Sequence, residues 1–290
     1  MEVNAPGFFS PLFFLVFVSG HKSQKYGLLN SQLTGLPHNQ PGRVNVVRYS
    51  RILLKLSGAA MAGDKDFGFN PTALNFIADE VLKLHSAGIQ VGIVIGGGNI
   101  FRGNLGAQWG IEHAEADNIG MMATVINSLM LRGVLTSRGN AEVRVMTAIP
   151  IDTVAEPFIR LRAIHHMDKG YICIFAGGTG QPFMTTDYPA VQRAIEVRAQ
   201  ALLSAKSGTD GIYTADPNQD PAARRYSQIS YDSVVRQNLR AMDQPAVLLA
   251  RDNRLRLHVF SFDHPDVMYR LCQGEDVGTL IANVDQDQLA

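Results

Sequence analysis

The stretch VGIVIGGGNIFRG, residues 91–103, joins an apolar run to three consecutive glycines and then to an arginine, Arg102. Glycines at the end of a strand leave backbone N–H groups bare, so an anion such as phosphate can approach them closely. Arg102 adds a positive charge close to the same turn. The stretch therefore indicates a phosphate site, although a glycine-rich turn alone is about as often purely structural.

Three more stretches could serve the same chemistry. KLSG, residues 55–58, places a lysine inside an apolar strand, where an ammonium is costly unless it is paired or snorkels out at an edge. GGTGQPFMTTD, residues 177–187, is a loop rich in hydrogen-bond donors that ends in the carboxylate of Asp187. GIYTADP, residues 211–217, contains Asp216, which could equally be a helix cap.

Together these stretches suit the transfer of a phosphoryl group between two bound phosphates. Such a reaction needs N–H donors and cations at the phosphate oxygens and little covalent chemistry from the protein. Lys55 and Arg102 would neutralise the charge that develops on the moving group. Asp187 would organise these cations or a Mg²⁺ ion, and we assign no metal-ligand residue.

Several other enzyme classes are excluded by the absence of their motifs. The sequence has no G-x-x-x-x-G-K-[ST] stretch, which excludes the usual P-loop. GGGNIFRG does not fit the dinucleotide fingerprint G-x-G-x-x-G, because Phe101 occupies the place of the third glycine. H-E-x-x-H, C-x-x-C and G-x-S-x-G are also missing, which excludes zinc proteases of the H-E-x-x-H type, zinc ribbons and serine hydrolases with the G-x-S-x-G elbow.

The elements that must position these residues alternate between strand and helix from Arg48 onward. Strands are predicted at 50–58, 89–98, 141–150, 171–180, 211–217, 255–262 and 278–283. Helices are predicted at 70–88 (capped by Asn70), 116–139, 154–170, 188–206, 231–253 (one or two helices) and 264–274. The helix over 116–139 is apolar on nearly every side, so we expect it to be buried on most sides.

This alternation predicts an α/β fold, a three-layer α/β/α sandwich with a mostly parallel central sheet. Ligands of such folds bind at the carboxyl ends of the strands. The glycines at 58, 96–98 and 177–180 all fall at such ends. We therefore expect the candidate residues to meet at one edge of the sheet.

Composition limits the remaining possibilities. The 290 residues carry a formal net charge of +0, which gives no electrostatic footprint for nucleic acid. Cys173 and Cys272 are far apart in apolar surroundings and are expected to be buried thiols in a reducing compartment. We expect a cytoplasmic protein that does not enter the membrane.

The first 46 residues look unlike the rest. Residues 8–20 are strongly apolar, but they are short for a membrane span and lack a preceding positive region, so an export or membrane signal is the less favoured alternative. Residues 1–46 are interpreted as an appendage, disordered or a wrongly assigned gene start. Residues 47–290 are interpreted as a single catalytic domain.

The quoted motifs, in their order and spacing, resemble those of bacterial UMP kinases, which belong to the amino-acid-kinase superfamily. RILLKLSG, VGIVIGGGNIFRG, DNIGMMATVINSL, AGGTGQPFMTTD and AKSGTDGIYTADP carry the resemblance, which runs from about residue 49 to residue 283. The segment at 154–170 is most similar to actinobacterial members. The resemblance implies transfer of the ATP γ-phosphate to UMP with Mg²⁺, in pyrimidine nucleotide biosynthesis.

The resemblance also implies roles for individual residues. Lys55, Arg102 and Asp187 would be catalytic. The ATP site would comprise Lys55, Leu56, Ser57, Gly58, Gly98, Arg102, Ser207, Tyr213 and Asp216. The UMP site would comprise Gly97, Asp117 (at the ribose), Thr179, Gly180, Gln181, Pro182, Phe183, Met184, Thr185 and Thr186.

Regulation and assembly are implied in the same way. Members of the family are typically homohexamers that GTP activates and UTP inhibits. The GTP effect would involve Gly63, Asp64, Lys65, Asp66, Phe67 and Gly68. The helix at 116–139 would be a contact between subunits, with plain core burial as the alternative.

The chain departs from the family pattern at a few positions. Ala59 replaces an acidic residue, Gln181 an asparagine and Gln200 an aspartate, while Tyr188-Pro189 replaces small residues. These departures keep open a nucleotide-binding sensor or scaffold with weakened catalysis. A kinase of the same fold that acts on a carboxylate or carbamate is a second alternative, although Asp117 and the 177–187 loop favour UMP.

Overall fold

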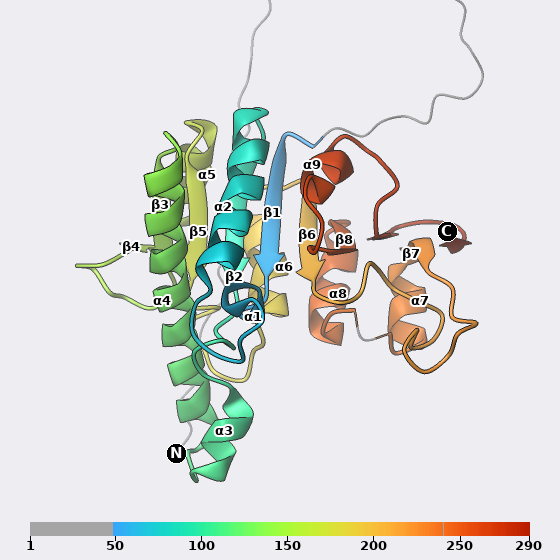
Figure 1. Ribbon diagram of the computed structural model, residues 1–290, viewed down its shortest axis with the longest axis horizontal. Helices are drawn as coiled ribbons and strands as arrows, with labels where there is room; N and C mark the ends of the chain where they lie inside the picture. Colours follow the sequence, from blue (N-terminus) through green and yellow to red (C-terminus); the bar gives the residue numbers. More distant parts are fainter. Residues whose placement is uncertain (1–48, 240) are drawn as a thin grey trace, which may run out of the picture. The chain divides into compact units, whose positions relative to one another are not determined.

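The computed structural model describes residues 49–239 and 241–290, so the predicted appendage over residues 1–46 lies outside the described residues. A ten-stranded sheet runs through the described part in the order β10-β7-β9-β8-β6-β1-β2-β5-β3-β4. Figure 1 labels its strands except β9 and β10. The strands are β1 (Arg51–Leu56), β2 (Gln90–Ile95), β3 (Val143–Thr147), β4 (Glu156–Pro157), β5 (Ile172–Ala176), β6 (Ala201–Lys206), β7 (Tyr226–Ser230), β8 (Arg256–Ser261), β9 (Thr279–Ala282) and β10 (Gln288–Leu289).

The sheet is mostly parallel, as predicted. Among the described strands, β9 against β8 and β10 against β7 are the antiparallel pairs. Central strands such as β1 and β2 are buried on both faces, which explains their nearly continuous apolar sequences. Because β1, β2, β5 and β6 are parallel neighbours, their carboxyl ends meet at one edge of the sheet.

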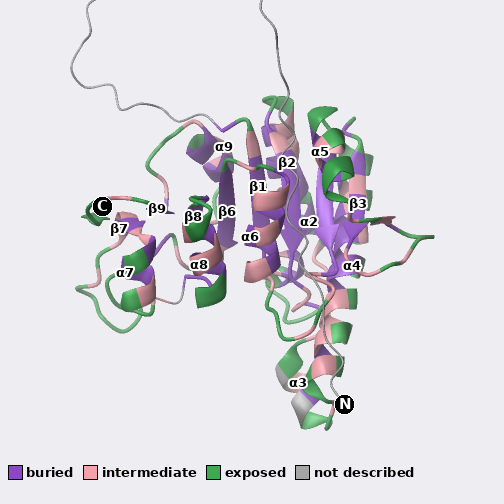
Figure 2. Cartoon of the chain, turned by 180° about the vertical axis from the view of Figure 1, so that it is seen from behind, coloured by how far each residue is buried: buried purple, intermediate pink, exposed green. Residues whose placement is uncertain are grey.

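Helices cover both faces of the sheet (Figure 2). One core cluster packs α2, α4 and α9 against one face, and a second packs α5, α6, α7 and α8 against the other. The helices are α1 (Ala59–Ala62), α2 (Pro71–Ser86), α3 (Gly103–Gln108), α4 (His113–Arg138), α5 (Arg160–Asp168), α6 (Asp187–Glu196), α7 (Tyr231–Arg236), α8 (Gln244–Asp252) and α9 (Val267–Cys272). The three-layer prediction is thereby confirmed.

Local signals account for several boundaries. Asn70 caps α2, since its side chain accepts hydrogen bonds from the N–H groups of Thr72 and Ala73, and Pro71 occupies the first turn.

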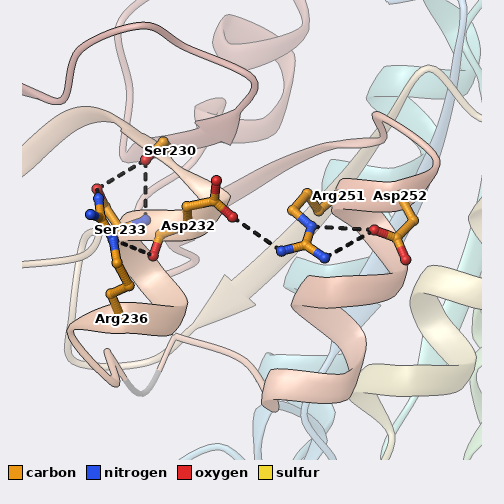
Figure 3. Close-up of polar contacts among 6 residues, drawn as sticks. All are labelled: Ser230, Asp232, Ser233, Arg236, Arg251 and Asp252. Atoms are coloured by element: carbon orange, nitrogen blue, oxygen red, sulfur yellow. Dashed lines mark hydrogen bonds and ion pairs between the residues drawn. The ribbon is translucent and has the colours of Figure 1, made fainter.

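Both cysteines are free and buried, and burial raises the pKa of each thiol to about 12. Surface polar contacts tie α7 to α8, with Arg251 between Asp232 and Asp252 (Figure 3).

The predicted helix over 188–206 is wrong in its second half. Helix α6 ends at Glu196, Arg198 adopts a left-handed φ of 61°, and Ala201–Lys206 forms the buried strand β6. The sequence ALLSAK is compatible with either element, and the pairing of this segment with β1 on one side and β8 on the other decides the outcome. The correction matters because β6 carries Lys206 to the edge where the candidate residues meet.

Three further expectations need correction. The helix predicted over 154–170 begins only at Arg160, because Glu156 and Pro157 pair with β3 as an extended segment. Residues 211–217 form no strand but one isolated bridge, between Tyr213 and Arg225.

The third correction concerns α4, which is not buried on most sides. Its side chains Met122, Ile126 and Met130 are 42%, 46% and 38% exposed. These three residues, spaced by four, form an apolar stripe along one face, which we call the α4 stripe. By length and composition α4 could cross a membrane, but its opposite face packs against the sheet and α2.

Candidate active site

The centre of the site is an ion pair between Lys55 and Asp187. Strand alternation turns Leu53 and Lys55 toward the face that α6 covers, because Ile52, Leu54 and Leu56 pack on the other face. Asp187 is the first residue of α6, and its Oδ1 lies 2.6 Å from Nζ of Lys55. The lysine is thus paired inside the sheet and does not snorkel out, which excludes the structural alternative for this residue.

Lys206 is a second cation that the sequence reading did not assign. It ends β6, and the register pairs Lys55 with Ser204, so Lys206 lies beyond Lys55 on the neighbouring strand and on the same face. Burial, and then the charge of Lys55, lowers the pKa of Lys206, while Asp187 and Asp243 oppose this shift. A lysine in this position is available to a phosphate.

Asp243 is the second unassigned residue of the centre. It precedes α8, and its backbone N–H donates to Oδ2 of Asp187 at 3.3 Å. Its carboxylate accepts a hydrogen bond from the hydroxyl of Thr185 in the 177–187 loop. Asp243 therefore joins the 177–187 loop to Asp187, the predicted catalytic carboxylate, and no motif in the sequence marked it.

A cavity of about 280 Å³ opens at the ends of β2 and β5. Eight of the residues predicted for the phosphates and for UMP line it, namely Gly97, Gly98, Arg102, Asp117, Gln181, Met184, Thr185 and Thr186. Its remaining wall comes largely from α4 and β5, including Met121, Thr124 and Phe175, which the sequence reading missed. The apolar wall beside polar loops suits a planar base.

The rest of the predicted UMP loop is placed outside this cavity. Thr179, Gly180, Pro182 and Phe183 do not line it. Phe183 is 65% exposed, and its backbone N–H donates to Oδ2 of Asp117 at 2.7 Å. Asp117 thus holds the loop in this structure and would have to share or release that bond to bind a ribose hydroxyl.

Arg102 lines the cavity but is engaged with the protein. Its Nε donates to the carbonyl of Gly98 and its Nη2 to the carbonyl of Asp66, both at 3.1 Å. Its guanidinium lies 5.1 Å from the ring centre of Phe67. Arg102 therefore ties the predicted effector loop, residues 63–68, to the glycine turn, and its contact with phosphates stays a prediction.

A second cavity, of about 500 Å³, opens at the end of β6. The predicted ATP residues Ser207, Tyr213 and Asp216 line it together with Lys206. The carboxylate of Asp216 accepts hydrogen bonds from Asn218 and Gln219, so it caps its own turn as well. Leu56 is fully buried in the core, which leaves only its backbone for a nucleotide.

Two of the glycines in these turns are needed for packing within the protein, whether or not a ligand binds there. A Cβ atom on Gly97 would lie 2.7 Å from the carbonyl oxygen of Gly120 in α4, and one on Gly58 would lie 2.7 Å from the backbone N of Gly98. At Gly98 a Cβ atom would meet nothing within 4 Å. Gly58 and Gly97 therefore allow close packing of backbone, and Gly98 leaves its open side toward a ligand.

The sequence departures are scattered around the centre. Gln200 lies at the start of β6, opposite the site, and its Oε1 accepts from the backbone N–H groups of Ser50 and Arg51. Pro189 and Gln181 line the first cavity, and Ala59 begins α1. The ion pair between Lys55 and Asp187 is intact beside them.

Comparisons with known proteins identify the family of the chain. Residues 50–261 match the amino acid kinase family. A uridylate kinase of Frankia casuarinae is 53% identical over 238 residues, which cover 82% of this chain and 92% of that protein. The chain belongs to the amino acid kinase family, among the uridylate kinases.

Other relatives and solved structures support the same assignment. A uridylate kinase of Xanthomonas oryzae is 50% identical over 233 residues, covering 80% of this chain and 96% of that protein. The crystal structure of UMP kinase from Bacillus anthracis superposes with a TM-score of 0.82 and 59% identity, covering 84% of this chain and 99% of that chain. UMP kinase from Ureaplasma parvum gives a TM-score of 0.77 at 33% identity, covering 81% of this chain and all 100% of that chain. The expected likeness to actinobacterial members is confirmed by the Frankia relatives.

Proposed function

We propose that the protein transfers the γ-phosphate of ATP to UMP and releases ADP and UDP. The observation that carries the proposal is the order of the strands: β1 ends in the region of Lys55, with β2 on one side and β6 on the other. The first cavity lies at the end of β2 and the second at the end of β6. Two substrates bound there would face each other across Lys55.

This placement supports a role for each group of residues. UMP would occupy the first cavity, with its base against α4 and β5 and its ribose at Asp117. The adenosine of ATP would occupy the second cavity, at Tyr213 and Asp216. Its phosphates would then run past Ser57 and Gly58 toward Gly98.

The chemistry is mainly electrostatic. The γ-phosphoryl group moves through a transition state whose negative charge is spread over its oxygens, and cations held in place beforehand stabilise it. Lys55 and Lys206 would supply these cations. Asp187 would hold Lys55 in position, and Asp243 would hold Asp187 and Thr185.

Mg²⁺ would enter with ATP. Among the described residues there is no group of three His, Cys, Asp or Glu side chains placed to bind a metal. Mg²⁺ commonly binds substrate phosphates, several waters and one or two carboxylates, and Asp187, beside Lys55, is the carboxylate that would serve it. When bound, the ion would neutralise charge on the β- and γ-phosphates.

Assembly and regulation are proposed from the same likeness. The α4 stripe of Met122, Ile126 and Met130 is exposed in the single chain and suits a contact between subunits of a homohexamer. Arg102 connects the 63–68 loop, at the carbonyl of Asp66, to the glycine turn, at the carbonyl of Gly98. GTP bound near this loop would act on the phosphate site through that connection. UTP would inhibit, and the enzyme would serve cytoplasmic pyrimidine nucleotide biosynthesis.

The test is an ADP-release assay with ATP and Mg²⁺ in which UMP, CMP, dUMP and no acceptor are compared, with and without GTP or UTP. We expect turnover that requires UMP. Saturable UMP binding without turnover would instead identify a binding protein on a kinase fold. Turnover with a carboxylate or carbamate acceptor would identify a different kinase.

A further inference from the structure

Two asparagines behind the glycine turn form a closed pair of amides. Asn99 follows the turn and Asn127 lies on the buried face of α4, and both are fully buried. Nδ2 of Asn127 donates to Oδ1 of Asn99 at 2.7 Å, and Nδ2 of Asn99 donates back to Oδ1 of Asn127 at 3.1 Å. Buried amides are costly unless they are bonded, so this pairing offsets its own burial.

The remaining hydrogens of the pair reach the backbone of two loops. Nδ2 of Asn127 donates to the carbonyl of Gly96 at 2.7 Å, and Nδ2 of Asn99 donates to the carbonyl of Gly68 at 2.9 Å. A carbonyl oxygen can only accept, so these two contacts fix which end of each amide is nitrogen. Every amide hydrogen of the pair therefore has one acceptor.

The pair also touches the other turn of the site. A Cβ atom on Gly58 would lie 2.6 Å from Oδ1 of Asn99 and 2.8 Å from the carbonyl oxygen of Gly96. The backbone of Gly58 is thus packed directly on the amide pair. One buried network therefore supports the two turns that follow β1 and β2, where the two phosphates are proposed to meet.

Neither asparagine lines the cavities of the site, so neither is placed to touch a substrate. We propose that Asn127 is a positioning residue for phosphoryl transfer, which holds the Gly96–Gly98 turn through Gly96 and holds Gly58 through Asn99. The inference rests on the proposed kinase function. A displacement of reacting groups by about 1 Å can lower a rate about 100-fold, so a small shift of this turn would be visible in kcat.

Asn127→Asp is the most informative variant because it keeps the shape and makes the hydrogen bond depend on pH. A protonated carboxyl retains one O–H that can donate to Gly96, whereas an ionised carboxylate opposes the oxygens of Gly96 and Asn99. Among the described residues, the side chain of Asn127 is hydrogen-bonded only to Gly96 and Asn99, neither of which titrates.

We expect kcat of Asn127→Asp to fall about 100-fold relative to the wild type as the introduced carboxyl ionises, with little change in KM for UMP. The wild type, measured over the same pH series, should lack this fall. Circular dichroism at each pH establishes that the variant stays folded. A purely structural asparagine would lower stability without adding a titration to kcat.

Ser128→Ala is the matched control. Ser128 is equally buried on α4, but its hydroxyl donates to the carbonyl of Thr124 within the helix. This variant should keep the wild-type kcat and pH profile. If Asn127→Asp does not fold, Asn127→Ser is the second variant, because its hydroxyl is too short to reach Gly96, and it should show low kcat at every pH.

The outcomes separate this inference from the proposed function. A wild type without UMP-dependent turnover would overturn the function and the inference together. An active wild type, with Asn127→Asp or Asn127→Ser matching its kcat at every pH, would overturn the inference and leave the function intact.

Discussion

Nζ of Lys55 lies 2.6 Å from Oδ1 of Asp187, and both side chains are largely buried, at 10% and 13% exposure. Lys55 comes from the centre of the sheet and Asp187 from the start of α6. Removing one member of a buried pair leaves the other charge uncompensated, which typically costs about 3–5 kcal/mol. The pair therefore sets the charge of the site as well as its geometry.

Asp187→Asn keeps the shape of this side chain and removes its charge. We expect kcat to fall about 100-fold or more, since Lys55 loses the carboxylate that orients it. The KM for UMP should change much less, because Asp187 is not among the residues that line the first cavity. Steady-state kinetics at saturating ATP measures both effects.

Asp252→Asn is the control for that variant. Asp252 also pairs with an arginine, Arg251, but on the surface of α8, where an ion pair contributes about 1 kcal/mol or less (Figure 3). Its kinetics should match the wild type. Equal losses in the two variants would contradict the assignment of Asp187 to the reaction.

Lys206→Met should lower activity and raise stability. Burial and Lys55 hold the pKa of Lys206 below its ordinary value of 10.5, so the folded chain binds this proton less tightly than the unfolded chain does. The charged lysine therefore opposes folding at neutral pH, and stability rises as the pH rises from the lowered pKa toward 10.5.

Thermal unfolding against pH checks this prediction. The wild type should gain stability through that alkaline window, and Lys206→Met should be more stable at pH 7 and lack the gain. In parallel kcat/KM for ATP should fall about 100-fold. A variant with wild-type kcat/KM for ATP would remove Lys206 from the site.

Gly97→Ala and Gly98→Ala differ only in what surrounds the added methyl group. At Gly97 it would press on Gly120 and Ala123 of α4, at 2.7 Å and 2.8 Å, so we expect a loss of about 1–3 kcal/mol. At Gly98 nothing lies within 4 Å, so the fold should be kept, and KM for ATP should rise if phosphates approach there. Denaturant unfolding of both variants separates packing from ligand contact.

Ile126→Glu tests the α4 stripe. Ile126 is 46% exposed at the middle of the stripe, so a carboxylate there should break a contact between subunits. Light scattering should show the wild type as an assembly and the variant as smaller species. Thr136→Glu, exposed on the same helix outside the stripe, should assemble normally; a monomeric wild type would contradict the proposed hexamer.

The main strands could be predicted because buried parallel strands are continuous apolar runs that end in glycine turns. Lys55, Gly97 and Asp187 followed from that rule and from motif resemblance. Lys206 was missed because ALLSAK reads as the continuation of a helix until β1 and β8 pair with it. A strand that forms because neighbouring strands pair with it has few residues in its own sequence that predict a strand.

Contacts between distant segments were beyond sequence reasoning for a different reason. Asn99 and Asn127 are ordinary residues in their own segments and gain a role only when α4 packs on the end of β2. The bond between Asp243 and Thr185 likewise depends on how α8 and the 177–187 loop pack. The pattern of residues within one segment therefore does not predict such contacts between segments.

Phosphoryl transfer across Lys55 is tested by following the label from γ-labelled ATP in the wild type and in Lys55→Met. We expect the wild type to move the label to UMP and yield labelled UDP, and the variant to lose this transfer while still binding UMP. Label released only as inorganic phosphate, or equal transfer in Lys55→Met, would contradict this expectation.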